Sequence, residues 1–478
     1  MYNRKVYYGI IKPRLGGFMD QIKLLQTRRS KILAAGTETR KYIAELTDAD
    51  SFVELSGFSF SKNDFYDEGA EGEGVITGFA TIDGYPVYIA AQNGAVLSGG
   101  VSHANCQKLL RCLQLAEKNS TPIIYVLDSL GVQIGEGVNV LEGLAAVLSK
   151  ASRLHGIVPQ FAIVAGEVYG QSALLAAAAD FTFFIKGSVL AANSPLVISA
   201  KSGKNLFKEQ VGGAGALADT NLVASEEENI AAVREKIVKV LDILPFCNAA
   251  VVENGADLNA SSPALNEGCT ADALVEAVFD EGTAFCFGTG APEVRCMLGR
   301  IGGISVAAVL FDKENGVELD AQNVAKIDSL VRFAGYFDLP FITFVNTLGL
   351  KADLATNNSF ALKQIYQLME DYELLENAKI AVVYQKAIGL GYTLFAAKSM
   401  GFDYTYAFAN AKIALFDDTQ GAEIEFAGEK ADKGKLAAKY AAENSDPIHA
   451  AKNGYVDNII EPQFVRSYLI ASLQMLLK

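Results

Sequence analysis

The sequence has few of the residues that build metal centres and disulfide frameworks. Its 478 residues include six cysteines and three histidines. No two cysteines have the CxxC spacing of a zinc ribbon. In a chain of this length the cysteines need no disulfide framework, and we expect them to be reduced thiols. These absences predict a protein without a metal site.

Long apolar runs are absent as well. No stretch reaches the roughly 18 consecutive apolar residues that indicate a membrane-spanning helix. The N-terminal segment MYNRKVYYGIIKPR lacks the apolar core of a signal peptide. Half of the residues are apolar and a fifth are charged, which is typical of a globular protein. We therefore expect a cytoplasmic protein.

Basic residues are also fewer than acidic ones. The chain has 41 Lys and Arg against 55 Asp and Glu, which gives a formal net charge of −14. Nucleic-acid binding requires a basic face that neutralises phosphates. The acidic balance therefore predicts no nucleic-acid partner.

The residues that are present form an internal repeat. GFATIDGYPV (78–87) is similar to LGRIGGISV (298–306), and STPIIYVLDSLGVQ (120–133) is similar to DLPFITFVNTLGLK (338–351). Matching glycines lie at a nearly constant offset of 218 or 219 residues: Gly84 and Gly303, Gly131 and Gly349, Gly170 and Gly389. The constant offset indicates the duplication of a whole domain.

Each copy has the same order of expected elements. A β-hairpin, a helix, a continuous apolar strand, a second helix and a second buried strand follow one another. The hairpins, helices and first apolar strands are expected at 75–91 and 293–311, 103–119 and 323–337, and 122–128 and 340–346. Strands that alternate with helices predict βαβ units in an α/β fold.

The expected boundary between the copies is residues 247–270, which are rich in Asn, Ala, Ser and Gly and show little periodicity. Helices expected at 226–244 and 270–282 flank it. We therefore predict an N-terminal domain at 1–246 and a C-terminal domain at 271–478. Residues 19–46 are expected to form a helical arm.

Two glycine turns are the first candidates for a functional site. FAIVAGEVYGQSALLAAAADF (161–181) and KIAVVYQKAIGLGYTLFAAKSMGFD (379–403) each read as a buried strand, a tight turn and an Ala-rich helix. Glycine in such a turn lets a ligand approach the backbone closely. The N–H groups at a helix start favour a partial negative charge. Gly170 and Gly389 are therefore predicted to polarise carbonyl groups, with close helix–sheet packing as the alternative.

Seven segments carry a resemblance to a known family. They are SGG (98–100), DSLGVQIGEG (128–137), GIVPQ (156–160), GEVYGQ (166–171), EQVGGA (209–214), DAQNVAKIDSLVRFA (320–334) and VYQKAIGLGY (383–392). In these segments the chain resembles the carboxyltransferase subunits of biotin-dependent acyl-CoA carboxylases and of related sodium-pumping decarboxylases. Propionyl-CoA carboxylase β and glutaconyl-CoA decarboxylase α subunits are the nearest types. The resemblance runs from residue 48 to about residue 428.

This resemblance implies a fold and a catalytic site. The fold is two tandem crotonase-like domains, each a ββα spiral of the ClpP/crotonase type. The N-terminal domain holds the thioester carbonyl of acyl-CoA in an oxyanion hole at Gly170 and Gln171. The C-terminal domain holds the ureido carbonyl of carboxybiotin at Gly389 and Leu390. The site forms between two subunits, so a homo-oligomer is expected.

Further residues are candidates for binding the acyl-CoA. Gly99 and Gly100 follow the hairpin, where they either let the CoA arm pass close to the backbone or form a plain turn. Asp128 and Ser129 end a parallel strand, where open α/β folds place ligands; a turn-forming role is the alternative. The candidates for the CoA phosphates are basic residues that are otherwise ordinary surface cations, namely Lys150, Arg153, Lys201 and Lys204.

The predicted reaction moves CO2 between carboxybiotin and the α carbon of a short acyl-CoA through an enolate. The sequence has no Met-Lys-Met-type biotinyl site, so biotin is expected on a separate carrier protein. A biotin carboxylase or a membrane decarboxylase subunit would perform the other half-reaction.

Two alternatives stay open. The glycine, alanine or arginine usual in the family is replaced at Leu130, Gln133, Gln171 and Leu390, which also fits a catalytically degenerate scaffold subunit. The second alternative is a carboxyltransferase that acts on a malonyl group bound to a carrier protein.

Overall fold

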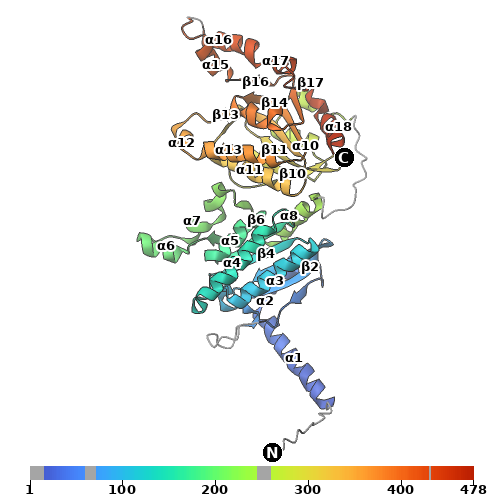
Figure 1. Ribbon diagram of the computed structural model, residues 1–478, viewed down its shortest axis with the longest axis vertical. Coiled ribbons are helices and arrows are strands. Elements are labelled where there is room, and N and C mark those ends of the chain that lie inside the picture. Colours follow the sequence, from blue (N-terminus) through green and yellow to red (C-terminus); the bar gives the residue numbers. More distant parts are fainter. Residues whose placement is uncertain (1–14, 60–70, 245–259, 430–431, 478) are drawn as a thin grey trace, which may run out of the picture.

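The computed structural model describes residues 15–59, 71–244, 260–429 and 432–477. These residues contain two β-sheets, one in each half of the chain (Figure 1). The N-terminal residues 1–14 and most of the expected linker, residues 247–259, lie outside the described residues. The exact domain boundaries therefore stay a prediction.

The first sheet is a β-hairpin continued by parallel strands. Its spatial order is β1 (Val53–Leu55), β2 (Val75–Ile82), β3 (Tyr85–Gln92), β4 (Ile123–Ser129), β5 (Gln160–Tyr169), β6 (Phe181–Ile185) and β8 (Val223–Glu227), and β7 (Val189–Ala191) pairs with the end of β5. The pairs among β1, β2 and β3 are antiparallel, and the later pairs are parallel. The first five residues of β4 are buried, as expected for a strand covered on both faces.

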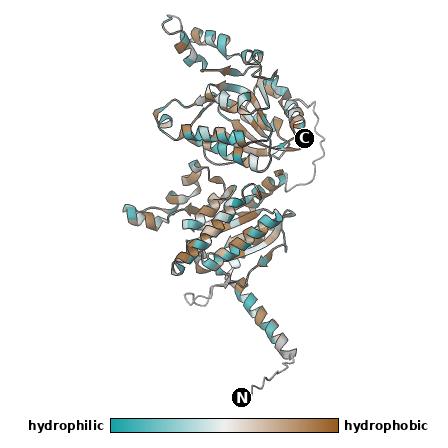
Figure 2. Ribbon diagram, in the orientation of Figure 1, coloured by the Kyte–Doolittle hydropathy of each residue, from teal (hydrophilic) through white to brown (hydrophobic). Residues whose placement is uncertain are grey.

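Helices cover both faces of this sheet. α3 (His103–Asn119) and α4 (Val138–Arg153) share a buried apolar cluster with one face, and α2 (Thr37–Leu46) and α8 (Ile230–Ile243) share one with the other. Hydrophilic and hydrophobic residues alternate along α3 and α4 (Figure 2), which is typical of amphipathic helices. Three short helices follow β5 and β7, namely α5 (Ala173–Ala177), α6 (Pro195–Ser202) and α7 (Lys208–Gly212).

The second sheet repeats this plan. Its spatial order is β17 (Asn458–Ile460), β15 (Tyr404–Phe408), β14 (Lys379–Ile388), β13 (Phe341–Leu350), β11 (Ile304–Phe311), β10 (Val294–Ile301) and β9 (Phe285–Phe287), with β12 (Val317–Leu319) on β13 and β16 (Lys412–Ala414) on β14. Its main helices are α10 (Ala271–Val278), α11 (Ala321–Tyr336), α13 (Ala361–Leu374), α14 (Leu390–Phe395), α15 (Asp418–Glu425), α16 (Lys433–Tyr440), α17 (Pro447–Lys452) and α18 (Val465–Leu476).

Local irregularities of the two sheets coincide. The β4–β5 pairing shifts register between Leu127 and Ser129, and the β13–β14 pairing shifts between Val345 and Thr347. These positions match at the offset of 218 residues seen in the sequence. The shared irregularity confirms that the chain contains two copies of one α/β unit.

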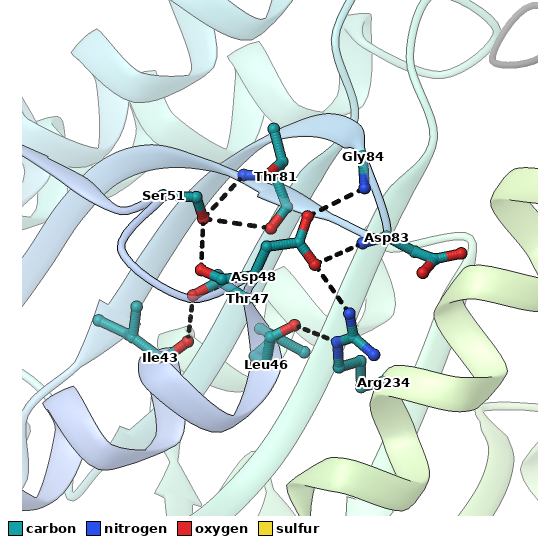
Figure 3. Close-up of polar contacts among 9 residues, drawn as sticks. All are labelled: Ile43, Leu46, Thr47, Asp48, Ser51, Thr81, Asp83, Gly84 and Arg234. Atoms are coloured by element: carbon teal, nitrogen blue, oxygen red, sulfur yellow. Dashed lines mark hydrogen bonds and ion pairs between the residues drawn. The ribbon is translucent and has the colours of Figure 1, made fainter.

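A partly exposed carboxylate links three elements of the first half. Asp48, after α2, accepts hydrogen bonds from the Asp83 and Gly84 N–H groups of the β2–β3 turn at 2.8 and 2.9 Å (Figure 3). Arg234 of α8 donates to the same carboxylate at 2.9 Å and to the Leu46 carbonyl at 3.1 Å. We call this set the Asp48 clamp, because it holds the hairpin between two helices.

The second half contains the same clamp. Asp280, after α10, accepts hydrogen bonds from the Gly302 and Gly303 N–H groups of the β10–β11 turn at 2.9 and 2.7 Å. Arg466 of α18 donates to Asp280 and to the Val278 carbonyl. α18 therefore occupies in the second half the place that α8 occupies in the first.

Aromatic packing joins the two halves. Phe181 of β6 contacts Phe161 at a ring-centroid distance of 5.8 Å within the first half. Across the boundary it meets Phe285, Phe287 and Phe333 at 6.2, 5.2 and 5.1 Å, all edge to face. Such pairs stabilise by about 0.5–1.5 kcal/mol beyond area burial. One continuous apolar cluster thus spans both halves.

Two expected elements need correction. The helix expected at 226–244 begins only at Ile230, because the preceding residues pair as β8 with β6 and the Asn229 side chain caps the helix at the Ala232 N–H. The expected arm 19–46 is two helices, α1 (Leu15–Ala35) and α2. The break falls at Gly36, where a Cβ would lie 2.9 Å from Ile76 Cδ1.

Candidate active site

The turn after β5 starts with Gly170 in a left-handed conformation. Its φ is 73°, which glycine adopts without steric cost. The short helices η4 (Gly170–Ser172) and α5 follow, so the first backbone N–H groups lie at a helix start. A Cβ on Gly170 would meet nothing within 4 Å, which leaves open space at the turn. Gly170 and Gln171 are both half-buried.

The loops after β3 and β4 pack beside this turn. A Cβ on Gly99 would lie 1.9 Å from the Asp128 carbonyl oxygen, so only glycine fits there. A Cβ on Gly100 would lie 2.1 Å from the Gln133 side-chain nitrogen. The Ser129 hydroxyl lies 3.4 Å from the Ser172 hydroxyl in η4. The structure thus brings Gly99, Gly100, Asp128, Ser129, Gly170 and Gln171 together at one edge of the first sheet.

Within this group, the side chains of Asp128 and Ser129 are engaged by the protein itself. Glycine Cβ atoms at Gly94 and Gly166 would lie 2.3 and 2.2 Å from the two Asp128 carboxylate oxygens. Burial raises the pKa of Asp128. Ser129 is fully buried, and its hydroxyl accepts the Gly131 N–H at 3.3 Å. These contacts favour the turn-forming role, and a direct substrate contact stays a prediction.

The four basic candidates fall into two groups. Lys150 forms an ion pair with α3, and Arg153 is exposed in the last turn of α4. Because the 16 residues of α4 span about 24 Å, this end lies away from the strand ends that carry Gly170. Lys201 and Lys204 are exposed on and just after α6, which follows β7 beside the end of β5. The structure thus separates Lys150 and Arg153 from the turn, and a role for Lys201 and Lys204 in phosphate binding stays a prediction.

A charged cluster of Glu167, Tyr169 and Lys208 lies just before this turn. These residues were not among the expected site residues. The Glu167 carboxylate accepts hydrogen bonds from Lys208 of α7 at 2.9 Å and from the Tyr169 hydroxyl at 2.8 Å. The Lys208 hydrogen bond lowers the pKa of Glu167, against the opposing effect of burial. Burial and the neighbouring carboxylate raise the pKa of Tyr169. Glu167 on β5 is thus ionised and links β5 to α7 through its ion pair with Lys208.

At the second turn, the glycine N–H is already hydrogen-bonded within the protein. Gly389 has φ 51° and ψ −120°, a conformation restricted to glycine, and its N–H donates to the Ala414 carbonyl of β16 at 2.9 Å. α14 begins at the next residue. The Leu390 and Gly391 N–H groups are therefore the helix-start donors at this turn. Gly391 was not among the expected site residues.

The end of β13 lies against these two N–H groups. A Cβ on Gly349 would lie 3.5 Å from the Leu390 nitrogen and 3.6 Å from the Gly391 nitrogen. The buried Thr347 hydroxyl accepts the Gly349 N–H at 3.1 Å and donates to the Val317 carbonyl at 2.7 Å. Thr347 occupies the repeat position of Ser129, so the duplication was the signal that could have identified it.

The two turns lie in different halves of the chain, after β5 in the first and after β14 in the second (Figure 1). Among the described residues no three His, Cys, Asp or Glu side chains gather as a metal site. In the same residues no helix is both long and apolar enough to cross a membrane.

Comparison with known proteins identifies the family. The family defined by the carboxyl transferase domain matches residues 34–478, which extends beyond the expected 48–428 at both ends. The methylmalonyl-CoA decarboxylase α subunit of Veillonella parvula is 28% identical and covers 96% of each chain. The propionyl-CoA carboxylase β chain of Cereibacter sphaeroides is 28% identical and covers 95% of this chain and 92% of the relative.

Solved structures show the same architecture. The transcarboxylase 12S hexamer core, crystallised with methylmalonyl-CoA, superposes with a TM-score of 0.89 at 24% identity, over 97% of this chain and 96% of that chain. This likeness confirms the expected fold of two tandem crotonase-like domains. With matching sequence over nearly its whole length, the chain belongs to the carboxyl transferase domain family and is a carboxyltransferase.

Proposed function

We propose that the protein moves CO2 between carboxybiotin and the α carbon of a short acyl-CoA. The observation that carries this proposal is the pair of duplicated glycine turns, each of which presents helix-start amides at the carboxyl ends of parallel strands. The relatives named for propionyl-CoA and methylmalonyl-CoA support a short acyl group. The domains proposed for the two roles are residues 1–246 and 271–478.

The first turn would serve the acyl-CoA. Loss of a proton α to a thioester places negative charge on the carbonyl oxygen. Backbone donors at Gly170 and Gln171 would stabilise that charge, and one such donor contributes about 3–4 kcal/mol in comparable sites. Lys201 and Lys204, on and just after α6, would meet the CoA phosphates. The side chains of Leu130 and Gln171 would make the approach to these N–H donors narrower than glycines at the two positions would.

The second turn would serve biotin, which supplies or accepts the carboxyl group when its carrier protein brings it to the site. The Leu390 and Gly391 amides are neutral donors beside a residue without a side chain, Gly349, which suits a neutral urea carbonyl. These residues would bind and orient the ring. Gly389 would shape the turn, because its own N–H is already used by Ala414.

A complete site would need two copies of the chain. The turns belong to different halves, and exposed apolar side chains surround both. Leu130, Ile134 and Leu174 are 56%, 89% and 49% exposed near the first turn, and Leu354, Phe360 and Leu415 are 79%, 79% and 71% exposed near the second. Clusters of this kind mark interaction surfaces. We propose a homo-oligomer that works with a biotin carboxyl carrier protein and with a biotin carboxylase or a membrane decarboxylase subunit.

The test is removal of one amide proton. Proline is accommodated at the first helical position, which Leu390 occupies in α14. Leu390→Pro deletes the N–H, whereas Leu390→Ala removes only the side chain. We expect CO2 exchange from malonyl-CoA or methylmalonyl-CoA to free biotin to fall about 100-fold in the proline variant and to persist in the alanine variant.

Other outcomes decide between the alternatives. Equal activity of Leu390→Pro and Leu390→Ala would remove this amide from the mechanism. No exchange by the unchanged protein with any acyl-CoA would favour the scaffold subunit. Exchange that requires a malonyl-carrier protein in place of CoA esters would favour the carrier-protein substrate.

A further inference from the structure

Two buried carboxyl groups lie between α11 and α13, helices of the second half that pack side by side (Figure 1). The side chains of Asp328 on α11 and Asp371 on α13 are only 3% and 10% exposed. Acidic side chains are almost never buried in this way unless they are paired. Their burial between two helices therefore requires a partner for each carboxyl group.

A single cation serves both carboxyl groups. Arg332, one turn after Asp328 on α11, places Nη2 3.2 Å from Asp328 Oδ2 and Nε 3.7 Å from Asp371 Oδ2. The second distance is too long for a hydrogen bond. If both carboxyl groups were ionised, two negative charges would face one positive charge, and a buried charge without a partner is costly. The charges balance when the pair of carboxyl groups holds one proton.

The hydrogen bonding of the pair is incomplete in the same way. Asp328 Oδ1 and Asp371 Oδ2 are buried, and neither accepts a hydrogen bond from the described part of the chain. The Tyr372 hydroxyl of α13 is also buried without a hydrogen-bond partner, so it donates to neither oxygen. An ionised carboxylate only accepts hydrogen bonds, whereas a protonated carboxyl group donates one. A proton on one carboxyl group therefore supplies the donor that the other lacks.

The other charged groups around the two helices are engaged elsewhere. Lys326 of α11 donates to the Gly290 carbonyl at 2.6 Å, and Lys379 of β14 donates to the Tyr372 carbonyl at 2.8 Å. The strands β11 and β13 contain no Asp, Glu, His, Lys or Arg. The remaining charged side chains of β10 and α13 are paired with other residues or exposed, namely Arg295, Arg300, Lys363, Glu370 and Glu373. His155 of the first half shares the boundary groove with Arg332.

The pKa of Asp328 agrees with a shared proton. Burial and the hydrogen bond with Asp371 raise this pKa to about 7, although the Arg332 charge opposes the increase. An aspartate in an unfolded chain has a pKa of about 3.9. The stability that the proton provides is therefore present in full below about pH 4 and is lost as the pH rises through about 7.

We propose that Asp328 and Asp371 hold one proton between them and that this proton fastens α13 to α11. Its loss leaves an unbalanced negative charge between the helices, and Asp371, the more exposed of the two, turns toward solvent. α11 carries Phe333, whose ring meets Phe181 of the first half at 5.1 Å, and α13 leads into β14, which ends directly before Gly389. The shared proton thus joins a helix at the boundary between the halves to the helix that precedes the strand of the second turn. This contact is independent of the reaction proposed above.

Substitution by asparagine tests the pair in the full-length protein. In Asp328→Asn and in Asp371→Asn an amide N–H replaces the shared proton, and a single carboxylate faces Arg332. Relative to either variant, the protection of α13 amides from hydrogen exchange in the unchanged protein should fall about tenfold per pH unit between pH 5 and pH 7. The matched control is Glu370→Gln, an exposed neighbour of Asp371 that should keep the pH dependence of the unchanged protein. The same pH profile in the unchanged protein and in both asparagine variants overturns the proposal.

Infrared difference spectroscopy observes the proton directly, because a protonated carboxyl group has a C=O stretching band that a carboxylate lacks. Between pH 6 and pH 9 the unchanged protein and Glu370→Gln should lose such a band. Both asparagine variants should lack this band at pH 6. Absence of the band from the unchanged protein at pH 6, or its persistence in both asparagine variants, overturns the proposal.

Discussion

Gly349 lies against the Leu390 amide. A Cβ on Gly349 would lie 3.5 Å from the Leu390 nitrogen, although 41 positions (390 − 349) separate the two residues in sequence. The bulge in β13 and the left-handed φ of 84° at Gly349 produce this approach. We therefore expect the absence of a side chain at Gly349 to decide whether a ligand carbonyl can reach the N–H groups at the start of α14.

Gly349→Ala should block that approach. The added methyl group would occupy the space in front of Leu390 N and would lie 3.0 Å from the Ile388 carbonyl. We expect CO2 exchange to fall about 100-fold and unfolding free energy to fall by about 1–2 kcal/mol from left-handed strain. Gly454→Ala is the matched control, because Gly454 has φ 75° and open space around its Cβ position. Full activity in Gly349→Ala would contradict the proposed role of the amides.

The Thr347 hydroxyl should affect the biotin side alone. Thr347→Val removes the partner of the Gly349 N–H and of the Val317 carbonyl. An unpaired buried group costs about 1–3 kcal/mol, and the Gly349 turn would lose its anchor. We expect a higher KM for free biotin and an unchanged KM for the acyl-CoA. Thr347→Ser keeps the hydroxyl and should restore the KM, and equal shifts for both substrates would contradict this division.

The equivalent change in the first half should have the opposite specificity. Ser129 anchors the Gly131 N–H and contacts the Ser172 hydroxyl beside Gly170. Ser129→Ala should therefore raise the KM for the acyl-CoA and leave the KM for free biotin unchanged. Steady-state kinetics with each substrate varied in turn measures both values. A rise for biotin would show that the first turn does not serve the acyl-CoA.

The duplication and the main elements were predictable from the sequence because they rest on local periodicity and on a constant offset. The helix expected at 103–119 is α3 with the same bounds, and the expected hairpin 75–91 is β2 and β3. The start of α8 was not predictable. Residues 223–227 become a strand only because β6 offers a partner that lies far away in sequence.

The site was predictable only as far as its turns. Gly170 and Gly389 can be recognised from the sequence. The hydrogen bond from the Gly389 N–H to the Ala414 carbonyl, however, depends on the pairing of β16 with β14. The proposal that Leu390 and Gly391 are the donors rests on that tertiary contact. The separation of Lys150 from Gly170 likewise depends on the length and direction of α4.

The Asp48 clamp predicts a loss of stability in acid. Burial raises the pKa of Asp48, but hydrogen bonds from Gly84, Thr81, Asp83 and Arg234 outweigh it and bring the pKa to about 2. This lies below the unfolded value of about 3.9. The clamp therefore contributes its full stability above about pH 4, and that contribution is lost as pH falls toward 2.

Asp48→Asn should remove this contribution. We expect a loss of about 1–3 kcal/mol at neutral pH and a smaller difference from the unchanged protein near pH 3, measured by urea unfolding between pH 3 and pH 7. Asp50→Asn, an exposed neighbour, is the control. A difference that stays constant over this range would show that the Asp48 charge is not what holds the hairpin.

An ion pair at the boundary between the halves should lose its stabilising contribution as the pH rises above neutral. His155 Nδ1 lies 3.5 Å from the Asp180 carboxylate, and its ring lies 5.9 Å from that of Tyr336, in a groove of about 440 Å³ lined by both halves. The Asp180 hydrogen bond raises the pKa of His155 above its usual value of about 6.5. The pair therefore stabilises the fold fully below about pH 6.5, and this contribution is lost as pH rises through the folded pKa.

His155→Phe keeps a ring beside Tyr336 without a titrating group. The difference in Tm between this variant and the unchanged protein should therefore shrink as the pH rises from 6 to 9. His449→Gln, an exposed control, should follow the unchanged protein, and parallel Tm curves for His155→Phe and the unchanged protein would contradict the linkage.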